Sequence, residues 1–303
     1  MAFAFAALFS LLFAPPKAAA DIIDPASLKI VGTAQILPTS VLRLTDTTDP
    51  DLTMPAPAGA AWTLNRRNVA DPWAASFDFQ MFGPTGHLDN DGSGGDGIAF
   101  LIQNSSMGTS ALGLGSGGMG FMGIDDSLAV MFDSYQNNAY YGDPSGHYIG
   151  VNTRGTFANV PHHFCTDNML TSDASQGTDL PGVNCNSNPA LGLSGPLNFD
   201  DGAVHNVTML YTPGQLAIYL DKAIALTVAV NLAQSLNLDN GTDAFLGFTA
   251  GTRFAYQNQD ILDFSFATVP EPPSSVLTLI GSALLALVAW KCKPRSAQNS
   301  KNI

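Results

Sequence analysis

A row of polar side chains follows an apolar stretch in the middle of the chain. Residues 128–132 are apolar, and Asp133, Tyr135 and Asn137 then occupy alternate positions, with Asp143 further along. Side chains two apart on an extended chain point to the same side, so the first three form one row. Carboxylates, amides and carbonyls are the oxygen ligands that Ca²⁺ prefers. The segment therefore predicts a calcium site, and the alternative interpretation is a strand followed by a polar turn.

The pattern around this row extends in both directions and comprises Val130, Phe132, Asp133, Tyr135, Asn137, Asp143, Pro144, His147, Ile149, Gly150 and Val151. It resembles the metal-binding segment of the L-type (legume-lectin-like) lectins. The resemblance implies that Ca²⁺ is held by Asp133, Asn137, Asp143 and the main-chain carbonyl of Tyr135. In that family a neighbouring Mn²⁺ shares both aspartates.

The sequence departs from the family at the second metal. The family places a glutamate two residues before the first aspartate and a histidine in the following loop, both as ligands of the transition metal. Here the glutamate position is Met131, and His147 is the one remaining match. A soft thioether does not replace a carboxylate for a hard ion such as Mn²⁺. The sequence therefore predicts a Ca²⁺ site, and the predicted Mn²⁺ site lacks the carboxylate ligand that Met131 replaces.

Three further segments resemble sugar-binding parts of the same family. Residues 95–100 match its Asp-Gly-aliphatic-Ala-Phe strand entry, residues 120–124 match a glycine-rich block, and residues 244–266 match its closing segment. The resemblance implies that Asp96 and Asn137 accept or donate hydrogen bonds to sugar hydroxyls. It also implies that Gly120 and Ala255 contribute from their backbones. An ionised carboxylate suits the role of Asp96, because it is a strong acceptor.

Short apolar or alternating runs, separated by turn residues, occur throughout the rest of the chain. Between residues 28 and 82 there are several such runs, and residues 204–211 and 215–221 flank a Pro-Gly turn as the strands of a hairpin do. This pattern predicts an all-β sandwich or barrel. The resemblance implies a concanavalin-like jelly-roll sandwich of antiparallel sheets over residues 21–268, with residues 156–199 as a loop insert.

The composition is strongly acidic and limits the classes of partner. Between residues 21 and 268 there are 24 Asp, no Glu and seven Lys or Arg. Such a surface repels phosphate backbones, which argues against a nucleic-acid partner. Cys165 and Cys185 lie in the polar insert and are expected to form a disulfide outside the cytoplasm, the alternative being two free thiols.

Both ends of the sequence carry the features of targeting segments. Residues 1–20 contain an apolar run and a small-residue motif, which predicts a secretory signal peptide. Residues 269–303 contain a Pro-Glu-Pro box, an apolar helix expected at 274–290 and a basic end. They resemble the PEP-CTERM sorting signal of bacteria. This resemblance implies a transmembrane helix, processing by an exosortase-type enzyme, and export to the cell surface or extracellular matrix. An ordinary membrane anchor is the alternative.

These features predict an exported, calcium-dependent lectin that binds glycans or exopolysaccharide. One alternative is a structural or adhesion protein of the matrix with a vestigial sugar site. Another is a sandwich-fold glycoside hydrolase, an enzyme class that normally uses paired carboxylates. The sole glutamate, Glu271, lies outside the predicted domain. The glutamate pair that is common in such enzymes is therefore absent, and the sequence predicts a protein that is not an enzyme.

Overall fold

The computed structural model describes residues 21–48, 55–137, 141–161 and 190–269. The predicted signal peptide, both cysteines of the predicted disulfide and the predicted helix at 274–290 lie outside these ranges. Within the ranges, no helix is both long and apolar enough to cross a membrane.

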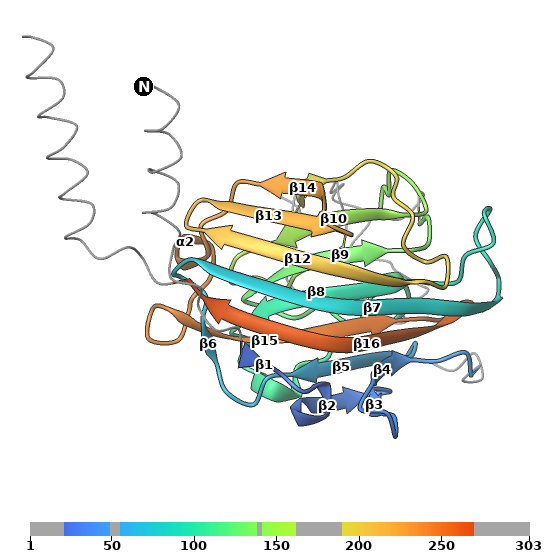
Figure 1. The fold of residues 1–303 in the computed structure, drawn as a ribbon, viewed down its shortest axis with the longest axis horizontal. Helices are drawn as coiled ribbons and strands as arrows, with labels where there is room; N and C mark the ends of the chain where they lie inside the picture. The colour runs from blue at the N-terminus through green and yellow to red at the C-terminus, as the bar shows by residue number, and fades with distance from the viewer. Residues whose placement is uncertain (1–20, 49–54, 138–140, 162–189, 270–303) are drawn as a thin grey trace, which may run out of the picture. The chain divides into compact units, whose positions relative to one another are not determined.

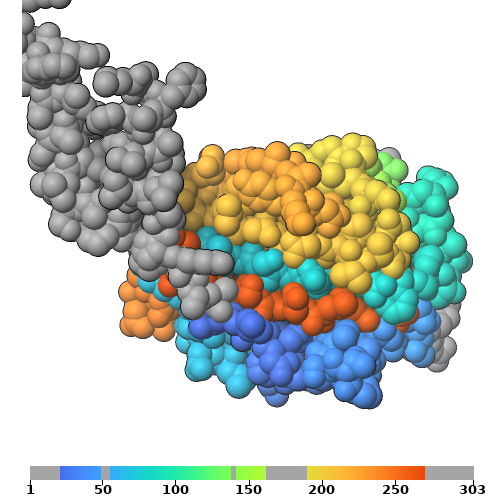
Figure 2. Space-filling view, in the orientation of Figure 1, coloured from blue at the N-terminus to red at the C-terminus, as the bar shows by residue number. Residues whose placement is uncertain are grey.

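The described chain forms two eight-stranded sheets in which every strand pair is antiparallel (Figure 1). The outer face of the first sheet is the one seen in Figure 2. Its central strand β7 pairs with β12 on one side and with β16 on the other. In spatial order the first sheet consists of β14 (Ala223–Val228), β13 (Gln215–Leu220), β12 (Val204–Thr212), β7 (Trp73–Gly86), β16 (Ala255–Thr268), β4 (Leu42–Thr45) and β3 (Gln35–Ile36), with β1 (Asp21–Ile22) beside β16.

The second sheet lies behind the first in Figure 1 and carries the predicted site on three neighbouring strands. In spatial order it consists of β11 (Ala190–Leu193), β10 (Tyr148–Thr153), β9 (Ser127–Asp133), β8 (Gly97–Gln103), β15 (Asp243–Gly251), β5 (Ala58–Trp62) and β2 (Lys29–Gly32), with β6 (Arg67–Asn68) beside β15. Short helical turns connect the strands: η1 (Pro25–Ser27), η2 (Gly108–Ser110), η3 (Ser116–Gly118) and α2 (Leu232–Ser235).

The two sheets differ in how their strands are buried. Most of β7 alternates between buried and half-buried residues, as a strand with one wet face does. In contrast, every residue of β8 and β9 is buried. The reason is that the second sheet has apolar material on both sides, so its central strands read as continuous apolar runs.

The main core lies between the sheets and is rich in phenylalanine. The ring of Phe77 lies 5.0 to 6.1 Å, centroid to centroid, from those of Phe100, Phe132 and Phe248. A second apolar cluster covers the other face of the second sheet and includes Trp62, whose indole N–H donates to the Ala111 carbonyl at 2.8 Å. In this second cluster, residues of the 111–124 loop pack onto the sheet together with Met131 and Tyr148, next to the predicted site.

The all-β antiparallel sandwich expected from the sequence is confirmed, and so is the hairpin formed by β12 and β13. The sequence predicted a loop insert over residues 156–199, and residues 190–193 of this range form a strand. There the chain forms β11, which pairs with β10 at the edge of the second sheet.

Candidate functional site

The predicted site residues meet where three strands of the second sheet have their ends. Asp133 is the last residue of β9, and it stands opposite Gly97 of β8 and Tyr148 of β10 in the strand register. A side chain at position 97 would meet the Phe132 carbonyl oxygen at 2.4 Å, so only glycine allows this close approach. The main chain of Asp96, just before β8, is thereby brought against the end of β9.

Two buried aspartates face one tyrosine hydroxyl. The hydroxyl of Tyr148 lies 3.1 Å from Oδ2 of Asp133 and 2.8 Å from Oδ1 of Asp143. The other oxygen of each aspartate accepts a backbone N–H, from Tyr135 at 3.1 Å and from Asn137 at 2.6 Å respectively. Both aspartates are at most 2 % exposed. Asp143 therefore lies beside Asp133 at the end of β9.

The Asn137 side chain connects this pair with Asp96. Its amide nitrogen lies 3.2 Å from the Tyr135 carbonyl oxygen and 3.5 Å from Oδ1 of Asp96. The Asp96 backbone is held in turn, because its N–H donates to the Gly251 carbonyl and its carbonyl accepts the Ser134 N–H. The structure thus brings Asp96, Asp133, Tyr135, Asn137 and Asp143 into one cluster.

The electrostatics of this cluster are those of carboxylates held close together away from water. Burial raises the pKa of Asp133 well above its usual range, and the nearby charge of Asp143 raises it further. Burial also raises the pKa of Asp96 to about 7; the Asn137 hydrogen bond opposes this rise, Asp143 adds to it, and the charge of Arg253 opposes it. The pKa of the Tyr148 hydroxyl is raised by burial and by both aspartates, so the hydroxyl keeps its proton at neutral pH and is a hydrogen-bond donor.

This donor set fits one calcium ion. It offers two carboxylates, the Tyr135 carbonyl and the Asn137 amide, whose oxygen would face the carbonyl after a half-turn of the amide group. A divalent cation would compensate the repulsion that raises the pKa of Asp133. Among the described residues no group of three or more His, Cys, Asp or Glu side chains could hold a metal. Calcium would therefore depend on the amide and the main-chain carbonyl.

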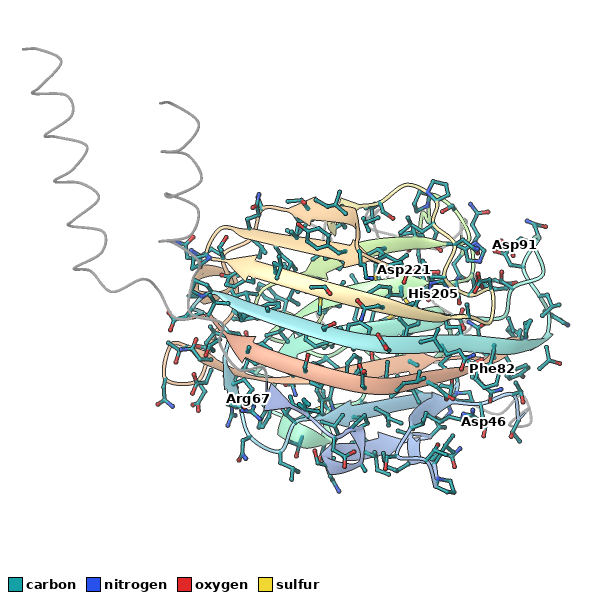
Figure 3. All side chains as sticks on the ribbon, viewed as in Figure 1. Asp46, Arg67, Phe82, Asp91, His205 and Asp221 are labelled. Carbon is teal, nitrogen blue, oxygen red and sulfur yellow. The ribbon has the colours of Figure 1, made fainter. Side chains whose placement is uncertain are left out.

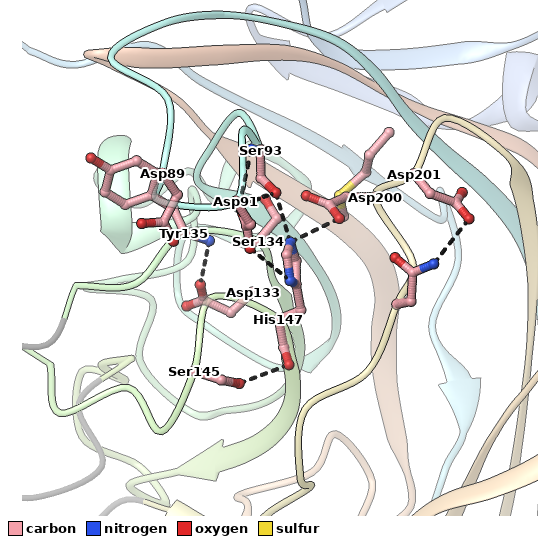
Figure 4. Close-up of polar contacts among 12 residues, drawn as sticks. Asp89, Asp91, Ser93, Asp133, Ser134, Tyr135, Ser145, His147, Asp200 and Asp201 are labelled. Atoms are coloured by element: carbon pink, nitrogen blue, oxygen red, sulfur yellow. Dashed lines mark hydrogen bonds and ion pairs between the residues drawn. The ribbon is translucent and has the colours of Figure 1, made fainter.

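The His147 ring contacts Ser93, Asp91 and Asp200 (Figure 4). Its Nε2 is 2.8 Å from both the Ser93 hydroxyl and Oδ1 of Asp200, and its Nδ1 is 3.2 Å from Oδ2 of Asp91. Successive side chains of an extended chain face opposite sides, so the next residue, Tyr148, is the one that points to the aspartates. The structure does not bring His147 to the position of a second metal ligand.

The two backbone candidates for sugar binding have different surroundings. The N–H of Gly120 donates to the Leu114 carbonyl at 2.8 Å, so this structure does not offer it to a ligand. Ala255 begins β16 beside the cluster: a side chain added at Gly95 would meet the Cβ atoms of Tyr135 and Ala255 at 3.1 and 3.3 Å.

Two residues near the cluster were not predicted from the sequence. Tyr148 bridges the aspartates, and Asp89 accepts the N–H of Gln136 at 2.9 Å, which fixes the loop between Tyr135 and Asn137. Strand alternation places His147 and Tyr148 on opposite faces, but the register with Asp133 that selects Tyr148 comes from the structure. No local pattern points to Asp89, because its contact joins residues 47 positions apart.

The family model of the legume lectin domain matches residues 23–278, which is most of the chain. The chain belongs to the legume lectin domain family. Its sandwich is that family's jelly roll, and the cluster described above lies on the residues by which the sequence resembled these lectins.

Solved structures of legume lectins and of a related domain share this fold. The basic winged bean lectin with Tn-antigen is 21 % identical with a TM-score of 0.56, and the match covers 82 % of this chain and 98 % of that one. Lectin II from Ulex europaeus is 18 % identical with a TM-score of 0.57, covering 82 % and 97 %. The exoplasmic/lumenal domain of VIP36 in its Ca²⁺/Man-bound form is 17 % identical with a TM-score of 0.55, covering 81 % and 84 %.

Proposed function

We propose that this protein is an exported, calcium-dependent carbohydrate-binding protein of the cell surface or extracellular matrix. The observation that carries the proposal is the position of Asn137. Its main-chain N–H binds Asp143, a candidate calcium ligand, and its side chain reaches Asp96, the candidate sugar acceptor. One residue thus links a cation site to a sugar site.

Each residue of the cluster has a distinct task in this proposal. Calcium, when bound, supplies positive charge that holds Asp133, Asp143 and the Asn137 amide in fixed positions. Asp96 then accepts hydrogen bonds from two sugar hydroxyls. After the half-turn that directs its oxygen to calcium, the Asn137 amide group donates to a third sugar oxygen. Because these groups are positioned before the sugar arrives, little conformational entropy is lost on binding.

An exposed aromatic side chain beside the cluster supports a sugar ligand. Phe254 is 43 % exposed, and it stacks on His87 with ring centroids 6.0 Å apart. The guanidinium carbon of Arg253 lies over the Phe254 ring, 4.7 Å from the ring centroid. Arg253 is also close enough to Asp96 for its charge to lower the pKa of that carboxyl. Pockets for small ligands commonly combine an apolar or aromatic face with a few polar groups, and sugars present both kinds of surface.

A binding assay on the full chain tests this function. A glycan array identifies a sugar, and calorimetry then measures its affinity in calcium and in EDTA. We expect binding in calcium, at least tenfold weaker binding in EDTA, and no detectable binding for Asp96→Ala. Asp126→Asn is the matched control. Asp126 is similarly buried but precedes the opposite end of β9, where it accepts the Asn237 N–H.

Equal affinity in calcium and in EDTA would show that the cation has no part in recognition. If no glycan binds to the wild-type chain, the alternative of a structural or adhesion protein with a vestigial site gains support. A variant Asp96→Ala that binds as well as the wild type would place the sugar elsewhere on the molecule.

The proposed export rests on the sequence features at both ends. A signal peptide at 1–20 and a sorting signal at 269–303 would direct the chain across the inner membrane, with an exosortase-type enzyme as a transient partner. Fractionation of cells that produce the full-length chain tests this. We expect the processed protein at the cell surface or in the matrix, bound to glycans or exopolysaccharide. Permanent retention of the uncut chain in the inner membrane would contradict processing.

A further inference from the structure

The face of the second sheet beside the two aspartates is filled by side chains. Met131 and Asp133 are two apart on β9, and Tyr148 stands opposite Asp133 on β10, so all three point to the same face. Met131 and Tyr148 are fully buried members of the second apolar cluster. A side chain added at Gly150, opposite Met131, would meet the terminal methyl of Met131 at 2.6 Å, which shows how closely this face is packed.

The oxygen atoms on this face already have a donor. The Tyr148 hydroxyl is 3.1 Å from Oδ2 of Asp133 and 2.8 Å from Oδ1 of Asp143, so one protein group lies between the two carboxylates. The remaining oxygens turn toward the main chain of Tyr135 and Asn137, on the side where calcium would bind. The pair therefore has one side facing the tyrosine and one side facing the candidate calcium ligands.

The groups on the filled side are poor ligands for a transition metal. Met131 offers a thioether, Tyr148 offers a phenol hydroxyl, and the imidazole of His147 is held by Ser93, Asp91 and Asp200 instead. Hard and borderline cations need carboxylate or imidazole ligands at such a position. A second cation adjacent to calcium, as the family resemblance implied, does not fit these residues.

We propose that the Tyr148 hydroxyl takes the place of the second cation, so that each chain binds one calcium ion and no transition metal. The hydroxyl lies within hydrogen-bond distance of both aspartates, donates its one hydrogen to either of them, and leaves their outer oxygens in position for calcium. The inference rests on the proposed function, because it concerns the same calcium site. It goes further in stating that the site is complete without Mn²⁺.

Metal stoichiometry of the full chain tests the proposal directly. The metal-free protein is dialysed against Ca²⁺ with and without Mn²⁺ or Zn²⁺, and the bound ions are counted by mass spectrometry. We expect one Ca²⁺ per chain in every mixture, with no change in the calcium titration when Mn²⁺ is added. One bound Mn²⁺ or Zn²⁺ per chain beside calcium would overturn the proposal. If no calcium binds at all, it is the proposed function that fails.

Variants identify the residues responsible. Met131→Glu combined with Tyr148→His installs a carboxylate and an imidazole on the filled face, and we expect this double variant to bind a second ion per chain. A folded double variant that still binds one ion would contradict the proposal. His147→Ala should leave the stoichiometry unchanged, and a lost ion in that variant would instead make His147 a ligand.

Tyr148→Phe keeps the ring and removes the hydroxyl, and it decides the matter if the double variant does not fold. We expect it to lower the midpoint of thermal unfolding more in EDTA than in calcium, because the metal-free aspartates then have no group between them. Tyr211→Phe is the matched control, since Tyr211 is buried and its hydroxyl accepts the Leu232 N–H at 3.0 Å far from the site. Equal losses for the two variants in EDTA would show that the Tyr148 hydroxyl has no special role.

Discussion

Two buried aspartates in this sandwich have opposite surroundings. Asp260 on β16 receives two hydrogen bonds of 2.8 Å from the Arg43 guanidinium on β4. Asp133 on β9 is buried to a similar degree, yet no cationic side chain forms an ion pair with it in the described part of the chain. Its near neighbours are instead the carboxylates of Asp143 and Asp96.

The difference between Asp260 and Asp133 distinguishes a structural carboxylate from a candidate ligand-binding one. The hydrogen bond and charge of Asp260 raise the pKa of Arg43, so this guanidinium keeps its charge and has its partner within the protein. Burial and the charge of Asp143 raise the pKa of Asp133, so this carboxylate is destabilised until a cation arrives. A buried carboxylate that forms no ion pair within the described residues is a candidate functional group, whereas a buried bidentate ion pair is consistent with structure alone.

Removing Asp260 tests the first half of the comparison. Asp260→Ala leaves the Arg43 guanidinium, whose side chain is 19 % exposed, without its partner. We expect a loss of about 3 kcal/mol in the free energy of unfolding, by the size usual for one broken buried pair. Urea denaturation should give the same loss in calcium and in EDTA. The control Asp21→Ala breaks an exposed pair with Arg67 and should cost less than about 1 kcal/mol.

Neutralising Asp133 tests the second half, and the effect depends on the metal. Asp133→Asn removes one of two like charges, so in EDTA we expect stability equal to or above that of the wild type. Calcium at 100 times its dissociation constant stabilises the wild type by about 2.7 kcal/mol, and the variant should lose this gain. Urea denaturation with and without calcium measures both. A variant that is much less stable in EDTA would mean that Asp133 has a structural role like that of Asp260.

The sequence predicted the fold and most of the cluster for a simple reason. The alternation of Asp133, Tyr135 and Asn137 is local, and local patterns are preserved when a strand forms. The residue of β10 that faces Asp133 was harder to assign. A shift of one position decides whether His147 or Tyr148 faces the aspartates, and register is a property of the whole sheet.

The surroundings of His147 could not be predicted from the sequence. Asp91 comes from the loop before β8 and Asp200 from the segment before β12, and only the closed sandwich brings them to one ring. The hydrogen bond from the Gly120 N–H to the Leu114 carbonyl could not be predicted either, because a glycine-rich sequence does not specify which backbone groups pair.

His147 is a third case, in which the cationic partner of buried or half-exposed aspartates is itself titratable. It pairs with Asp91 and Asp200. The hydrogen bond to Asp200 is the largest effect that raises its pKa, and Asp91 and Asp89 add to it. A raised pKa means that the stabilisation is fully present below the ordinary value of 6.5 and is lost as the pH rises through the folded-state pKa. We therefore expect His147→Gln to cost about 1 kcal/mol at acidic pH and less at alkaline pH.

Urea denaturation of His147→Gln across this range, in EDTA, measures the difference from the wild type. His205→Gln is the matched control, because His205 forms pairs with Asp201 and with Asp221, which Figure 3 labels beside it. Burial lowers the pKa of His205, but the hydrogen bonds and charges of the two aspartates together raise it. Both variants should show the same direction of pH dependence, while Asp260→Ala, with a permanent cation, should show none over this range. If the stability lost in His147→Gln stays constant with pH, the imidazole acts as a neutral hydrogen-bonding group. The three sites would then not differ as proposed, with Arg43 as a permanent cation, His147 as a titratable one and calcium as an external one.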